Sequence, residues 1–392
     1  MDIARLALTL AALALGGRLG ALIDAPLVGE ILVGTLLGPD GAGFVPENSA
    51  VVLVGDFALC LLVMEGGLSI DIGALRSVGP IAFAIAVSGT MLPIALGSAY
   101  MSACGYGVMA GVAAGTSLSS TSIGMATKVL QTLGELSSPL GNLVCVAAMV
   151  DDVLSLVLLA VVRKSTTTFV DVAKPVGASA AVVVVGVGLA ALTPRVVARR
   201  PAPPDLLVAM ALALGAGAAF AADKAGSTPL LGCFVGGVCF ASVDGVARRF
   251  DAVVAPPAAW LYRVFFASIG FVVPLGKLAS APAALYGLLL SVVAVLTKVG
   301  TGLFYREDPW KVGWAMVGRG ELGFVMALET FRSGRTSRLA LSVTVWALLV
   351  ATLVSPVVLR RLLARGDGVE GESEDETRRA EAAPAAADKA PP

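Results

Sequence analysis

The chain of 392 residues is 57% hydrophobic and only 14% charged, and its mean hydropathy is +0.88. Soluble domains contain about 25% charged residues. This composition therefore excludes one or two ordinary water-soluble domains and predicts an integral, multi-pass membrane protein. The chain has no histidine, and its five cysteines show no C-x-x-C spacing. We accordingly expect small buried thiols, no histidine or cysteine metal centre, no cofactor and no nucleic-acid partner.

Hydropathy and the positions of Gly, Pro and charged residues predict thirteen apolar segments along the chain. The first could instead be the core of a cleaved signal peptide, but Asp2 weakens the basic leader that such a peptide needs, so we favour a helix. The distribution of Arg and Lys in the loops favours an outside N-terminus and an inside C-terminus. The segments are 3–19, 26–39, 50–69, 79–101, 107–131, 139–163, 174–194, 204–222, 227–242, 256–275, 282–304, 310–331 and 338–362.

Two glycine-rich stretches resemble each other. LVGEILVGTLLG begins at residue 27 and LLGCFVGGVCFA begins at residue 230, and their glycines coincide at two positions. The copies are seven segments apart, and this odd number predicts two repeats of opposite orientation, as in secondary transporters. We therefore divide a transmembrane domain, 1–365, into repeat one at 26–163, linking helices at 174–222 and repeat two at 227–362. The acid-rich segment 366–392 is expected to be disordered.

Two of the apolar segments carry polar residues near their centres. The first contains the hydroxyl-rich run Ser119, Ser120, Thr121 and Ser122, and the second contains Arg319 and Glu321 within VGRGELGF. Inverted-repeat transporters place binding sites where such discontinuous helices cross, because the freed backbone groups can bind ions. We expect these six residues to line a cavity there. For a single hydroxyl, bonding to its own helix is the favoured alternative. For Arg319 and Glu321, the alternative is a purely structural role in which they stabilise the break.

Two adjacent acids, Asp151 and Asp152, lie near the middle of the apolar segment 139–163. A charge at the bilayer centre costs about 2.5–3.5 kcal/mol on insertion scales. Adjacent helical residues point about 100° apart, so one carboxylate can face a hydrated cavity while the other faces a partner. Lys298, deep in the segment 282–304, is the obvious partner for an acid. The alternatives are that the two acids lie at the membrane–water interface, and that the Lys298 side chain extends to that interface.

Several long stretches resemble the cation:proton antiporter-2 family, in the family's order and over nearly the whole chain. The stretches are VGEILVGTLLGP, LSSTSIGMATKVLQTLGELSSPLGNLV, AAMVDDVLSLVLLAVV, LLGCFVGGVCFAS, FFASIGFVVPL and GRGELGFVMA. The resemblance implies a thirteen-helix fold with a dimerisation domain and a mobile core. It also implies that Asp152 binds the cation transiently and releases protons, that Asp151 pairs with Lys298, and that the Asp-Asp pair supports electrogenic exchange. A homodimer is implied as well, whereas the tail leaves no room for a nucleotide-binding domain.

The combined prediction is a secondary transporter, not an enzyme, that exchanges a monovalent cation for protons by alternating access. The cation is expected to be Na⁺, with Li⁺ and K⁺ left open, so that a K⁺/H⁺ antiporter of the same fold is the first alternative. A sodium-coupled organic-anion symporter and a channel-like protein are the others. Its partners would be these ions, the membrane lipid and a second copy, and the sequence leaves the kind of membrane open.

Overall fold

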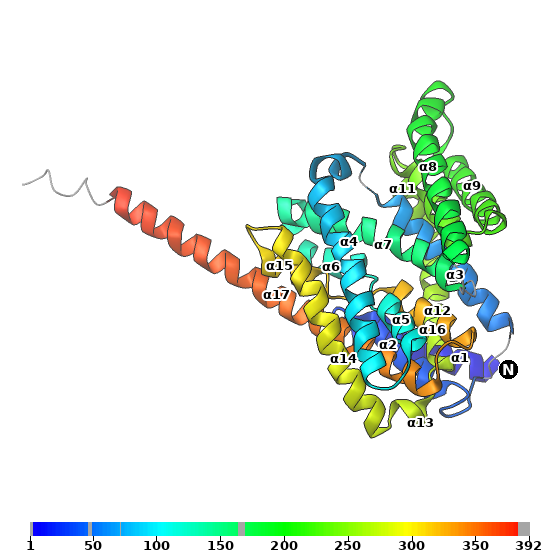
Figure 1. The fold of residues 1–392 in the computed structure, drawn as a ribbon. Helices are drawn as coiled ribbons and strands as arrows, with labels where there is room; N and C mark the ends of the chain where they lie inside the picture. The colour runs from blue at the N-terminus through cyan, green and yellow to red at the C-terminus, as the bar shows by residue number, and fades with distance from the viewer. Residues whose placement is uncertain (1–2, 46–48, 71, 164–168, 383–392) are drawn as a thin grey trace, which may run out of the picture.

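The computed structural model describes residues 3–45, 49–70, 72–163 and 169–382, and all regular elements in these ranges are helices (Figure 1). This confirms the predicted all-α fold. In chain order the elements are α1 (Ile3–Ala21), α2 (Pro26–Leu37), α3 (Ser49–Leu68), α4 (Ile72–Ala103), α5 (Val108–Ser117), α6 (Ile123–Thr132), η1 (Glu135–Ser137), α7 (Pro139–Arg163), α8 (Phe169–Arg199), α9 (Pro204–Ala225), α10 (Pro229–Ala241), α11 (Val246–Val253), α12 (Ala255–Val272), α13 (Leu275–Leu278), α14 (Ala281–Val299), η2 (Gly300–Phe304), α15 (Pro309–Ala315), α16 (Glu321–Arg332) and α17 (Arg338–Ala382).

Each of the predicted apolar segments overlaps described helices. Within the described ranges, six helices are long and apolar enough to cross a membrane, or seven if α11 and α12 are one span with a bend of 65°. The multi-pass character is therefore confirmed. Other apolar helices, such as α2 and α10, are shorter than a bilayer is thick, so the count of thirteen transmembrane helices stays a prediction.

The two glycine-rich copies form α2 and α10, and their packing is equivalent. A side chain at Gly29 would overlap the carbonyl of Gly16 in α1, and one at the matching Gly232 would overlap α9. A side chain at Gly34 would overlap α12, and one at the matching Gly237 would overlap α3. Each copy thus contacts its preceding helix and the second apolar segment of the other repeat, and both contacts need bare backbone.

Packing divides the helices into two groups. The core group comprises α4–α7 and α14–α17, with close pairs between α4 and α5, α4 and α7, and α14 and α17. The flanking group comprises α1–α3 and α8–α12, built around α10, which packs on α9, α3 and α8. The site described below lies where the two groups face each other.

The last helix, α17, continues past its apolar part. Its backbone is helical to Ala382, and the distal part projects away from both groups (Figure 1). The helix therefore runs into the acidic segment that the sequence predicted to be disordered, and residues 383–392 lie outside the described ranges. The proposed domain boundaries stay predictions.

Candidate ion-binding site

Two interrupted helices cross in the core group. The chain leaves helical geometry between α5 and α6 and again between α15 and α16. At the crossing, the Ser122 amide donates to the Gly318 carbonyl at 2.8 Å, and the Thr121 hydroxyl donates to the Met316 carbonyl at 3.3 Å. The predicted pair of crossed, discontinuous helices is therefore confirmed. Four half-helix ends meet here, so carbonyls and amides with no intrahelical partner converge at the crossing.

Glycine allows the two breaks to approach this closely. A Cβ at Gly320 would lie 3.1 Å from the Thr121 carbonyl oxygen, and a Cβ at Gly323 would lie 2.6 Å from that of Ser117. Any larger residue would force the breaks apart. The glycines of the GRGELG stretch thus serve backbone-to-backbone packing at the crossing.

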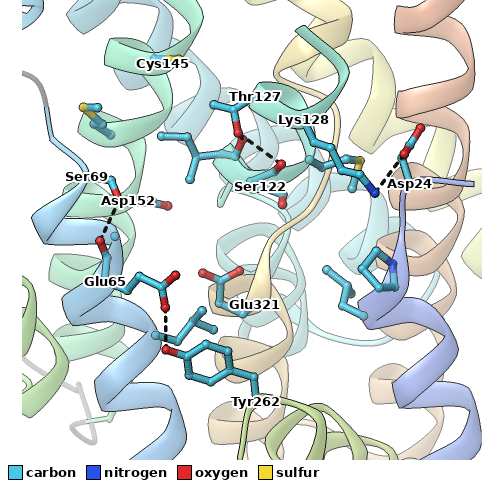
Figure 2. A pocket seen from close by; sticks show the side chains of 18 of the residues that line it. Asp24, Glu65, Ser69, Ser122, Thr127, Lys128, Cys145, Asp152, Tyr262 and Glu321 are labelled. Atoms are coloured by element: carbon cyan, nitrogen blue, oxygen red, sulfur yellow. Dashed lines mark hydrogen bonds and ion pairs between the residues drawn. The ribbon is translucent and has the colours of Figure 1, made fainter. Parts of the chain in front are cut away.

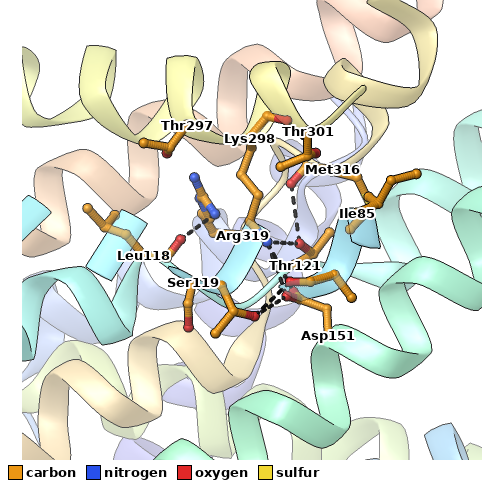
Figure 3. Close-up of polar contacts among 12 residues, drawn as sticks. Ile85, Leu118, Ser119, Thr121, Asp151, Thr297, Lys298, Thr301, Met316 and Arg319 are labelled. Atoms are coloured by element: carbon orange, nitrogen blue, oxygen red, sulfur yellow. Dashed lines mark hydrogen bonds and ion pairs between the residues drawn. The ribbon is translucent and has the colours of Figure 1, made fainter. Parts of the chain in front are cut away.

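Asp151 and Lys298 form an ion pair behind the crossing (Figure 3). Lys298 Nζ lies 3.2 and 3.3 Å from the two Asp151 carboxylate oxygens and donates to the Thr121 hydroxyl at 2.7 Å. Both ionic side chains are 0% exposed. The Thr90 hydroxyl of α4 lies 3.0 Å from Asp151 Oδ1. The contact implied by the family resemblance is present, and it is fully enclosed.

Arg319 is also fully buried, in the break before α16. Its guanidinium donates to the carbonyl of Leu118 and, at 2.6 Å, to the carbonyl of Ala294 in α14. It therefore supplies donors to carbonyls at the break and ties the crossing to α14. Its Nε has no hydrogen-bond partner among the described residues.

Asp152 points the other way, into a cavity of about 840 Å³ between the two helix groups (Figure 2). Of the six residues predicted to line a cavity, Ser122 and Glu321 lie on its wall with Asp152. The other four are buried within the crossing, outside the wall of this cavity: Ser119, Ser120, Thr121 and Arg319. Their hydroxyl and guanidinium groups mainly face backbone carbonyls, as in Ser119 bonding to the Thr116 carbonyl at 2.7 Å.

The flanking group supplies the opposite wall. Glu30 of α2 pairs with Arg263 of α12 at 3.5 Å, and Glu65 of α3 accepts a hydrogen bond from the Tyr262 hydroxyl at 2.6 Å. Sequence analysis missed these four residues. The one available signal was a single glutamate inside each of two apolar segments, since an acid in such a place needs a partner or water. Nothing local marked the tyrosine or the arginine as that partner.

Acidic residues outnumber basic residues in the cavity lining. The lining contains five acids and two bases. Low-dielectric walls of one sign of charge concentrate counter-ions, so this lining attracts cations toward the carboxylate at its inner end. The acids are Asp24, Glu30, Glu65, Asp152 and Glu321, and the bases are Lys128 and Arg263.

A family model described as "Sodium/hydrogen exchanger, transmembrane" matches residues 6–365. The chain belongs to the sodium/hydrogen exchanger family. It is 28% identical over 386 residues to the high-affinity Na⁺/H⁺ antiporter NhaS3 of Synechocystis sp., covering 87% of this chain and 83% of that one. It is 26% identical over 373 residues to the Na⁺/H⁺-K⁺ antiporter GerN of Bacillus cereus, covering 91% and 95%. The solved sodium proton antiporter MjNhaP1 of Methanocaldococcus jannaschii has the same fold, with a TM-score of 0.68, 16% identity and coverage of 92% and 99%.

In this exchanger the cavity extends from Asp152 toward one end of several helices. Its lining runs from Asp152 to the turn after α1, the end of α3 and the start of α7, where Asp24, Ser69 and Ser137 lie. At the other end of α7, Arg163 pairs with Glu329 at 3.4 Å.

An ion-pair cluster lies at the open mouth of the exchanger cavity. Asp24, in the turn between α1 and α2, pairs with Lys128 of α6 at 3.1 Å and with Arg360 of α17. Asp24 belongs to the flanking group and both bases belong to the core group. The cluster therefore bridges the two groups beside the cavity.

Proposed function

We propose that this exchanger carries Na⁺ in one direction and protons in the other by alternating access, with Asp152 as the shared binding group. The proposal rests on one observation, the different surroundings of the two adjacent acids. Asp152 lines the cavity, whereas Asp151 is enclosed with Lys298. A carboxylate that faces a cavity on one side and is enclosed by protein on the other can bind either a proton or a cation, and the two compete.

The crossing of the broken helices supports a cation beside Asp152. Hard cations prefer oxygen ligands, and Ser122, Thr127 and Glu321, whose side chains carry oxygen, are in the same wall. The acidic lining raises the local cation concentration. Movement of the core group against the flanking group would then expose the loaded site to the other side.

Lys298 supports electrogenic exchange. Its ammonium lies 3.2 Å from Asp151 Oδ2, next to the residue that binds the ion, so proton binding by the lysine and ion binding at the neighbouring acid are coupled. If Lys298 releases its proton when the cation enters, more protons than cations move in each cycle. We further propose that the flanking group forms a homodimer in the lipid bilayer.

The test is exchange by the purified protein in liposomes with a trapped pH dye, given pulses of Na⁺, Li⁺ or K⁺. We expect a Na⁺ pulse to move protons in wild type, and Asp152→Asn to abolish the response. Asp205→Asn is the matched control, because Asp205 is 67% exposed on α9 and, among the described residues, forms an ion pair only with the surface residue Arg249. Exchange in the Asp152→Asn variant at the wild-type rate would refute the assignment.

A second candidate is K⁺/H⁺ exchange, which the similarity to a protein named as a Na⁺/H⁺-K⁺ antiporter favours. The K⁺ pulse separates it from Na⁺ exchange. Proton movement driven by K⁺ alone would replace the first candidate. A protein that passes ions without moving protons against their gradient would be channel-like, and the proposal of exchange would fall.

A further inference from the structure

Two consecutive residues of α4, Gly89 and Thr90, form one wall of the Asp151–Lys298 site. Thr90 is 0% exposed, and its hydroxyl lies 3.0 Å from Asp151 Oδ1. A Cβ at Gly89 would lie 3.1 Å from Lys298 Nζ, closer than ordinary contact. The same turn of α4 therefore presents a hydroxyl to the acid and bare backbone to the ammonium.

The Thr90 hydroxyl has two acceptors within reach. Besides Asp151 Oδ1, the Ala86 carbonyl of its own helix lies 2.9 Å away. A hydroxyl has one proton to donate, and a bond to an ionised carboxylate is about twice as strong as one to a neutral acceptor. The hydroxyl donates to Asp151 while that carboxylate is charged. When the charge on Asp151 is neutralised, rotation of the O–H bond returns the proton to the carbonyl, so no buried donor is left unsatisfied.

Few donors reach the Asp151 carboxylate. Within the described part of the chain, it accepts hydrogen bonds from Lys298 of α14 and Thr90 of α4, and both reach Oδ1, at 3.3 and 3.0 Å. The other charged groups that interact with it are Asp152 on α7 and Arg319 at the crossing, and Glu321 in turn interacts with Asp152. In a site where both side chains are 0% exposed, each lost donor weakens the ionised state.

We propose that Thr90 is a positioning residue for ion exchange, whose hydroxyl holds the Asp151 carboxylate against Lys298 while Gly89 leaves the space that the ammonium occupies. Thr90 does not line the cavity and acts on the transported ions only through the buried pair. The inference rests on the proposed function and extends it to a helix that carries no ionisable residue at the site.

The test compares Thr90→Val with Thr90→Ser in the liposome exchange assay. Valine keeps the shape and removes the donor, whereas serine keeps the donor. A hydrogen bond to a charged group contributes about 1.5–3 kcal/mol, which corresponds to a loss of about ten-fold or more in the rate of Na⁺-driven proton movement. We expect Thr90→Val to show this loss together with an altered pH profile, because the hydroxyl no longer holds the Asp151 carboxylate against Lys298. Thr90→Ser should remain close to wild type.

Thr344→Val is the matched control. Thr344 is a buried threonine of α17 whose hydroxyl donates to the Ala340 carbonyl of its own helix at 2.9 Å. Its replacement removes the same group without touching the ion pair, so the rate and the pH profile should stay near those of wild type.

A second pair of variants tests the wall if Thr90→Val fails to insert. Gly89→Ala places a methyl group against the ammonium of Lys298, whereas Gly79→Ala, on the same helix, meets nothing within 4 Å. We expect a slower exchange rate and an altered pH profile in Gly89→Ala alone.

Two results would overturn the role of Thr90. One is a Thr90→Val variant with the rate and pH profile of Thr344→Val, and the other is an equal loss in Thr90→Ser and Thr90→Val. Absence of ion-driven proton movement in wild type would refute the proposed function and this inference together, so the two failures are distinguishable in one assay.

Discussion

Removal of Lys298 should be strongly destabilising, because its partner cannot reach water. Lys298→Ala deletes the ammonium that lies 3.2 Å from Asp151 Oδ2, in a site where both side chains are 0% exposed. Breaking a buried pair by removal of one member costs about 3–5 kcal/mol. The Thr121 hydroxyl also loses the donor that lies 2.7 Å away. We therefore expect a clear drop in the melting temperature of Lys298→Ala in detergent.

The double variant separates a true pair from two independent residues. Asp151→Asn combined with Lys298→Ala leaves neither charge stranded, and an amide at position 151 still accepts a hydrogen bond from Thr90. Contacting residues show coupling energies of about 0.5–3 kcal/mol. The double variant should therefore be less destabilised than the sum of the two single variants. Melting temperatures of the four proteins in one detergent complete the cycle.

Transport at imposed membrane potentials adds a functional readout to the same proteins. If Lys298 carries one of the exchanged protons, exchange that survives in Lys298→Ala should no longer respond to potential. Destabilisation that is additive within about 0.5 kcal/mol would show that Asp151 and Lys298 are not energetically coupled, and the role proposed for the lysine would fall.

Three further predictions concern the rest of the fold. A protein truncated after Arg365 should insert and exchange at the wild-type rate in liposomes, and normal insertion without exchange would contradict this. Gly34→Ala should lower the melting temperature, because its methyl group would overlap the backbone of α12, whereas the control Gly188→Ala on α8 meets nothing within 4 Å; equal melting temperatures would refute the close packing. Asp24→Asn should lower the melting temperature slightly at low salt and not at high salt, because Lys128 in its ion pair is 49% exposed; a loss that persists at high salt would contradict screening.

The sequence by itself determined most of the membrane architecture. The apolar segments, their interruption at the Ser119–Ser122 run and at Gly318–Gly320, and the repeat that became α2 and α10 were all predictable. Each depends on the solvation of one stretch of chain in lipid, where a polar group or a break is conspicuous against an apolar background. The divergence of Asp151 from Asp152 was also predictable, because it follows from the geometry of one helix.

Only the tertiary structure decided which residues complete the site. Thr90 is one hydroxyl in an apolar helix, and most such hydroxyls bond to their own backbone, so nothing local distinguishes it from Thr344. Glu30 and Glu65 were visible as acids, but their partners on α12 were not. The packing of α4 against both α7 and α14, and the facing of two helix groups across a cavity, bring together residues more than a hundred positions apart. Local sequence patterns indicate which stretches form lipid-facing helices and where those helices break. These contacts, in contrast, arise from the packing of several helices against one another.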